Sequence, residues 1–298
     1  MPSIVTHHLF AKEVADSINL KVNNNYYIFA QSHDYLYYNH NKKYRKLAHE
    51  AHIKNTQKYI LNIIKYIKDN HQTHNVNTLS YLYGVITHYV LDSTAHPYLF
   101  YKSGLKSSNH REIERNIDSL IYEEKTNKPY RKLKISKSII VRPLFTRNLM
   151  KCIDYAYSET YGINNISKIY LRSIREARIL FNVVSYDRLG IKLSIYKLID
   201  KLFKTKSYCL STHIKGNELY LNKEKNKWIH PCIKSKTYKS SFNDLYKNSI
   251  KKTIKIIEDI NDYFNNIITL KELMKSIPNI SYNTGLLIED NKKMSYFE

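Results

Sequence analysis

The stretch Gly84-Val-Ile-Thr-His88-Tyr-Val-Leu-Asp92-Ser-Thr-Ala-His96-Pro97 decides both the fold and the chemistry of this chain. Its composition predicts the second half of a helix that begins near Asn77 and that Pro97 stops. Its two histidines, its aspartate and its glycine are each four residues apart, so they lie on one face of that helix. Imidazole and carboxylate groups are usual zinc ligands, and they form a poor hydrophobic core face. The alternative is a pair of buried, hydrogen-bonded histidines without a metal.

A second pair of a histidine and a carboxylate follows on the next predicted helix. His110 and Glu114 are again four residues apart, and the isoleucines between Ile113 and Ile121 supply the stripe that faces the core. Helical bundles build metal sites from such pairs on neighbouring helices. Glu114 alone would be interpreted as a solvated surface charge. Two pairs together predict a metal site between the two helices.

The composition favours a helical protein with a substantial core. The chain has 298 residues, of which 43% are hydrophobic, and only six glycines and six prolines, too few for a fold rich in tight β-turns. Hydrophobic periodicity predicts further helices at about 9–20, 48–69, 143–160, 166–185, 190–204 and 241–268, with an irregular segment between 206 and 240. We therefore expect a zinc-binding helical core over 1–125, further helices of the same domain over 126–205, and a basic C-terminal extension over 206–298.

The positive charge lies mainly in the later part of the chain. Residues 1–125 carry a balance of +4 and residues 126–298 a balance of +18, within a total of +22. Such an excess is typical of proteins that contact an anionic membrane surface or a nucleic acid. A set of solvated helices, with lysine favoured by an AT-rich genome, is the alternative.

The three cysteines, Cys152, Cys209 and Cys232, form neither a Cys-x-x-Cys motif nor an even set for disulfides, which indicates a reduced compartment. The N-terminal residues show no basic segment followed by an apolar run, so no signal peptide is predicted. No apolar stretch reaches the length of about 18 residues that a membrane span needs. We therefore expect a cytoplasmic protein, with a peripheral location at the membrane as an alternative.

The order of these residues resembles one known family. The set His7, Asp34, His49, His88-x3-Asp92-x3-His96-Pro97 and His110-x3-Glu114 is similar to that of the zinc-dependent phospholipase C family, above all its bacterial, largely uncharacterised branch. The resemblance is strong over residues 1–125 and weaker through Leu221-Asn222, Trp228–Pro231 and Ser241-Phe242. It implies an all-α, multi-helix bundle with a cluster of two or three zinc ions in a cleft.

The resemblance also implies a role for each ligand. Asp34, His49, His88 and Asp92 would hold one ion, with Asp92 bridging to a second. A further ion would be held by His96, His110 and Glu114. His7 would bind the ion that the family also ligates through its processed N-terminal residue. His8 remains an alternative to His7, and His52 an alternative to His49.

Such a cluster supports hydrolysis of a phosphodiester by metal-activated water, with phospholipid as the favoured substrate. The resemblance makes Asp34 the general base. Two other functions fit the same residues. One is a single-strand nuclease of related fold, because nucleic acids are also polyanionic phosphodiesters. The other is a non-catalytic, zinc-stabilised module that binds anionic surfaces, for which closed four-ligand sites would be expected.

Overall fold

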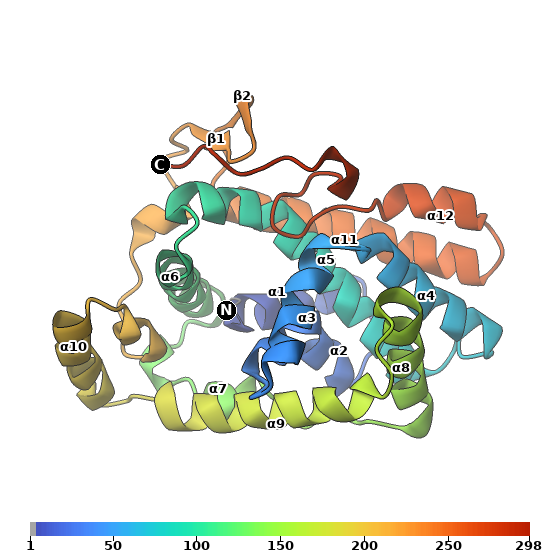
Figure 1. The fold of residues 1–298 in the computed structure, drawn as a ribbon, viewed down its shortest axis with the longest axis horizontal. Coiled ribbons are helices and arrows are strands. Elements are labelled where there is room, and N and C mark those ends of the chain that lie inside the picture. Colours follow the sequence, from blue (N-terminus) through green and yellow to red (C-terminus); the bar gives the residue numbers. More distant parts are fainter. Residues whose placement is uncertain (1–3) are drawn as a thin grey trace.

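A computed structural model describes residues 4–298 and consists mainly of helices (Figure 1). The α-helices are α1 (Ile4–Ser17), α2 (Asn24–Phe29), α3 (Lys42–Ile53), α4 (Thr56–Asp69), α5 (Val76–Ser103), α6 (Ser107–Thr126), α7 (Ile135–Ser138), α8 (Arg147–Tyr161), α9 (Ile166–Val184), α10 (Ile191–Phe203), α11 (Phe242–Phe264) and α12 (Leu270–Ser276). The 3-10 helices are η1 (Ser32–Tyr38), η2 (Tyr130–Lys132), η3 (Ser207–Leu210), η4 (Glu218–Leu221) and η5 (Ile288–Asp290), and the strands are β1 (Trp228–His230) and β2 (Ile233–Tyr238). The predicted all-α fold is confirmed.

The long helix α5 runs through the middle of the molecule, and α1, α2, α4, α6 and α11 pack around it (Figure 1). The side chain of Asn75 caps its start by accepting a hydrogen bond from the amide of Asn77. The prediction that Pro97 stops this helix was wrong, because α5 continues to Ser103 and ends at Gly104, whose φ is 61°. A proline in a helix interior costs about 3 kcal/mol, and Tyr98 and Leu99, which follow it, are buried in the hydrophobic core.

Gly84 lies on α5 where α2 approaches most closely. A Cβ atom at this position would lie 2.6 Å from the carbonyl oxygen of Tyr26 and 2.9 Å from the Cβ of Phe29. Such distances are shorter than van der Waals contact, so a side chain here would push α2 away from α5. The glycine of the opening motif therefore serves helix packing, whereas its neighbours on the same face serve the site.

The predicted helix over 48–69 is two helices, α3 and α4. The chain breaks at Asn55, whose φ of 54° lies in the left-handed region that asparagine tolerates. The helices predicted at 143–160, 166–185, 190–204 and 241–268 correspond to α8, α9, α10 and α11 within a few residues. The irregular segment contains the antiparallel pair β1–β2, in which Trp228 stacks on Tyr238 with 4.4 Å between ring centroids.

The C-terminal segment returns across α5 and docks there (Figure 1). Gly285, at a φ of 62°, passes so close to α5 that a Cβ would lie 2.3 Å from the carbonyl oxygen of Ser93. The amide of Glu298 donates to the carbonyl oxygen of Tyr101 at 2.8 Å. One continuous hydrophobic cluster contains residues of all three predicted segments, such as Ile4, Ile153 and Tyr282. The segment boundaries at 125 and 205 stay a prediction. Within residues 4–298, no helix combines the length and apolar character that crossing a bilayer requires.

Candidate metal centre

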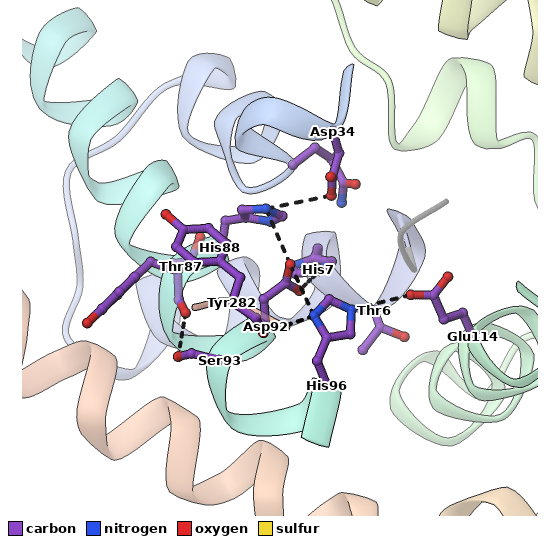
Figure 2. A network of polar contacts seen from close by, with 12 residues as sticks. Thr6, His7, Asp34, Thr87, His88, Asp92, Ser93, His96, Glu114 and Tyr282 are labelled. Carbon is purple, nitrogen blue, oxygen red and sulfur yellow. Dashed lines mark hydrogen bonds and ion pairs between the residues drawn. The ribbon is translucent and has the colours of Figure 1, made fainter. Parts of the chain in front are cut away.

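His88, Asp92 and His96 of α5 lie among His7 of α1, Asp34 of η1 and Glu114 of α6 (Figure 2), and Asp92 and His96 line a cleft. His88, Asp92 and His96 succeed each other by one helical turn, which puts their side chains in one row along the helix. The cleft has a volume of about 160 Å³ and is lined by Asp34, Tyr37, His49, His52, Asp92, His96, Phe100, His110, Glu114 and Asn283. The candidate ligands of the sequence analysis therefore gather in one place, with the exceptions described below.

The first cluster joins His7, Asp34, His88 and Asp92, whose ligand atoms all lie within 4.8 Å of one another. The Nε2 atom of His7 is 2.9 Å from Oδ1 of Asp92, and Nε2 of His88 is 3.4 Å from Oδ2 of Asp92. Asp34 Oδ2 is 3.6 Å from Nε2 of His88. Four side chains from α1, η1 and α5, all buried, thus form a compact set of nitrogen and oxygen ligands.

Asp118 of α6 fixes the start of α1 and with it the position of His7. Its carboxylate accepts hydrogen bonds from the Thr6 amide and hydroxyl, each at 2.8 Å, and from the Val5 amide at 3.3 Å. A carboxylate at this end of a helix satisfies free amides and complements the helix dipole. His8 points away from the cluster toward Tyr27, at 5.2 Å between ring centroids. The structure therefore brings His7, and not His8, to the cluster.

The structure places His52, and not His49, against the first cluster. His52 Nε2 lies 3.0 Å from Oδ1 of Asp34 and 3.7 Å from Oδ2 of Asp92. Its Nδ1 donates to the carbonyl oxygen of Ala48 at 2.6 Å, which leaves Nε2 to face the cluster. His49 is exposed and lies at the rim of the cleft. The assignment implied by the resemblance thus differs from this geometry, because α3 turns its buried face, with Ala48 and His52, inward.

The second cluster consists of His96, His110 and Glu114. Glu114 Oε1 lies 3.1 Å from Nε2 of His110 and 3.6 Å from Nε2 of His96. The His110 ring is stacked on Phe100 at 4.5 Å between centroids, and its Nδ1 is 3.3 Å from the hydroxyl of Ser103. These contacts hold the imidazole with Nε2 toward the carboxylate, as partners of a metal-bound histidine do.

Asp92 lies between the two clusters. Its Oδ2 is 3.6 Å from Nδ1 of His96 in the second cluster, while its Oδ1 contacts His7 in the first. The charge of His96 and a hydrogen bond from His7 outweigh burial and hold the pKa of Asp92 well below its usual range. In return, Asp92 and Glu114 outweigh the burial of His96 and raise its pKa to about 9. A single ionised carboxylate therefore touches imidazoles of both clusters.

His88 shows that these side chains fit a metal. It is completely buried, and neither of its ring nitrogens has a hydrogen-bond partner in residues 4–298. Burial lowers its pKa to about 4 although Asp92 and Asp34 lie nearby, so the imidazole is neutral. Buried polar atoms are nearly always satisfied, and an orphaned one indicates an ion or a water. Tetrahedral zinc with ligands at 2.0–2.2 Å sets its ligand atoms about 3.3 Å apart, in line with the separations above.

Two residues that the sequence analysis did not identify, Tyr282 and Asn283, complete the site. The carbonyl oxygen of Tyr282 accepts a hydrogen bond from His96 Nδ1 at 3.2 Å, and its ring packs against His88 and His52 at 5.5 and 5.3 Å (Figure 2). The neighbouring Asn283 lines the cleft. Neither residue lies in a motif, so no local pattern could have indicated them. The C-terminal segment therefore forms one wall of the site.

His33 directly precedes the candidate ligand Asp34 in the sequence. It is completely buried, and its Nδ1 lies 2.7 Å from the hydroxyl of Tyr157. Its ring is 5.6 Å from that of His52 and 6.3 Å from that of His88, between centroids. His33 therefore lies directly behind the candidate ligands and links them to α8.

Comparison with known proteins agrees with this geometry. The family model described as zinc dependent phospholipase C matches residues 6–165, a range that contains every candidate ligand. No curated protein and no solved structure matches the chain. The matched residues make up more than half of the sequence and include α5 and α6, which carry most of the two clusters. The chain belongs to the zinc-dependent phospholipase C family.

Proposed function

We propose that this protein is a zinc-dependent phosphodiester hydrolase of the phospholipase C type, with phospholipid as its substrate. The observation that carries the proposal is the second cluster, which has only three ligand residues, lines a cleft that is open to solvent and is joined to the first cluster by Asp92. A structural zinc site needs one closed set of four ligands, whereas a hydrolase keeps open positions and several ions close together. Membership of the zinc-dependent phospholipase C family also supports a hydrolase.

We assign the ligands from the distances. His7, Asp34, His88 and Asp92 would hold zinc in the first cluster, and His52 would complete that set in place of His49. A second site would be formed by His96, His110 and Glu114, with Asp92 shared between the two.

The zinc ions, when bound, would supply a nucleophilic water near neutral pH and neutralise the charge on the phosphoryl oxygens. Asp34 would act as general base, because its carboxylate faces the cleft and contacts both His52 and His88. These two histidines hold the carboxylate in one orientation. Tyr37 and Asn283, which line the cleft, would border the bound substrate.

The test measures metal content and hydrolysis on the same preparation. We expect more than one zinc per chain, hydrolysis of phosphatidylcholine and of a nitrophenyl phosphodiester, loss of both activities on chelation and their recovery with zinc. His88→Asn should abolish activity, whereas His74→Asn, a change of an exposed histidine outside both clusters, should leave it intact. Faster cleavage of single-stranded DNA than of phospholipid would favour the nuclease alternative. Bound zinc without turnover of any diester would contradict the proposal.

A further inference from the structure

The helix α10 presents an apolar stripe to solvent. None of its thirteen residues, all of which the structure describes, is buried. Ile191, Ile195, Leu198 and Leu202 are 60%, 52%, 61% and 68% exposed. They are spaced by four, three and four residues, so they lie on one face of the helix. Large apolar side chains gathered on one exposed face mark an interaction site.

The opposite face of α10 is the one that holds it to the protein. The Tyr196 hydroxyl donates to the carbonyl oxygen of Val184 at 2.9 Å, and the partly buried Leu193 side chain packs against the hydrophobic core. Asp200 accepts from the amide of Tyr208 at 2.9 Å. Tyr196, Leu193 and Asp200 lie about half a helical rotation from the stripe. The apolar stripe therefore points away from the molecule.

The surroundings of the stripe are strongly basic. Residues 188–206 contain one acidic residue, Asp200, and six basic residues: Arg188, Lys192, Lys197, Lys201, Lys204 and Lys206. The Asp200 carboxylate is already occupied by local hydrogen bonds. A helix with an apolar face and a lysine-rich polar face is typical of helices that lie in the interface of an anionic membrane. Two copies of this segment would repel each other, which disfavours a dimer through α10.

The segment that contains α10 is linked to α6, the helix that carries His110 and Glu114. Lys206, three residues after α10, forms an ion pair with Glu112 of α6. Glu112 lies two residues from both His110 and Glu114, and therefore on the opposite side of α6. In Figure 1, α10 and α6 occupy the same end of the molecule. A bilayer that contacts α10 therefore lies at the end of the molecule that also contains α6.

We propose that α10 docks on the surface of an anionic phospholipid bilayer, with its apolar stripe in the interface and its lysines against the headgroups. This inference rests on the proposed function, because a bilayer would be the source of the phospholipid substrate. Docking itself needs no turnover. It is therefore measurable apart from hydrolysis.

A tryptophan probe tests the docking directly. The natural tryptophan, Trp228, is 2% exposed, so its emission is insensitive to vesicles. We expect Leu198→Trp to shift its emission to shorter wavelength when vesicles of phosphatidylglycerol are added, and less with vesicles of phosphatidylcholine alone. Ile267→Trp, at a residue that is 68% exposed on the turn between α11 and α12, is the matched control and should not shift. Equal shifts at both positions, or none at residue 198, would overturn the proposal.

A loss-of-binding variant supplies the second readout. Replacing Ile195 and Leu198 by serine should weaken partition into phosphatidylglycerol vesicles by about tenfold per side chain, because each exposes most of its surface to the partner. Ile267→Ser should bind like the parent protein. Hydrolysis of a soluble nitrophenyl phosphodiester should be unchanged in both, which separates docking from the proposed function. Unchanged vesicle binding, or a dimer that the double substitution dissociates, would overturn the proposal.

Discussion

Asp92→Asn is expected to damage both metal sites at once. Asp92 Oδ1 lies 2.9 Å from His7, while its Oδ2 lies 3.4 Å from His88 and 3.6 Å from His96. The amide keeps the shape of the carboxylate, but it loses the negative charge and becomes a weak ligand. Glu114→Gln makes the same chemical change at a residue that contacts imidazoles of the second cluster only. The two variants therefore differ in how many sites each affects.

The expected magnitude follows from the number of sites. Loss of one partner in a metal site costs on the order of 10- to 100-fold in affinity, or about 1.4 to 2.7 kcal/mol. Asp92→Asn should lower the affinity of two sites by at least this factor, and Glu114→Gln that of one. Activity that needs both ions should then fall at least 100-fold for Asp92→Asn, and less completely for Glu114→Gln.

The assay combines elemental analysis of zinc per chain with hydrolysis of a nitrophenyl phosphodiester across a zinc titration. Asp16→Asn, at a solvent-exposed residue that pairs with Lys12, is the control for the loss of one carboxylate charge. It should match the parent protein in both measurements. A variant with asparagine at position 92 that keeps its full zinc content and activity would refute the assignment of a shared carboxylate.

Four further outcomes are expected. His52→Ala should lose zinc and activity, whereas His49→Ala should retain its zinc. Elemental analysis that shows zinc loss for His49→Ala and not for His52→Ala would instead support His49 as the ligand, as the resemblance implies. Asp34→Asn should lower kcat by roughly 10²- to 10⁴-fold while part of the zinc remains, as single-turnover kinetics would show. Chelation should lower Tm in a thermal melt, because ligands on separate helices tie the bundle together. Gly84→Ala should lower the free energy of unfolding by about 1–3 kcal/mol in a urea titration, because its Cβ would meet the carbonyl oxygen of Tyr26 at 2.6 Å.

The sequence was sufficient to predict the helical fold and the row of side chains on α5. Their spacing of four residues places them on one face whatever surrounds the helix, and the same holds for His110 and Glu114 on α6. Long periodic segments such as α9 and α11 were predicted within a few residues for the same reason. Local geometry alone decides these features.

Features that depend on how elements dock could not be predicted. His49 and His52 lie three residues apart on α3, and the packing of the face that contains Leu47, Ala48 and Ala51 turns His52 inward. Tyr282 reaches the site because the C-terminal segment folds back onto α5, a contact that no local pattern encodes. In α10 the hydrophobic spacing predicted the helix, yet its apolar stripe faces solvent. Periodicity shows that a stripe exists and does not say what covers it.

The contact of Tyr282 with the site has a consequence for biosynthesis. All candidate ligands are synthesised by Glu114, whereas the carbonyl that fixes His96 and the ring that covers His88 follow 168 residues later. A ribosome adds about 5–20 residues per second, so this interval lasts roughly 8 to 34 s. The nascent chain therefore presents its histidines and carboxylates to cellular metals before the wall formed by the C-terminal segment exists. Final closure of the centre is an event that follows translation of residue 282.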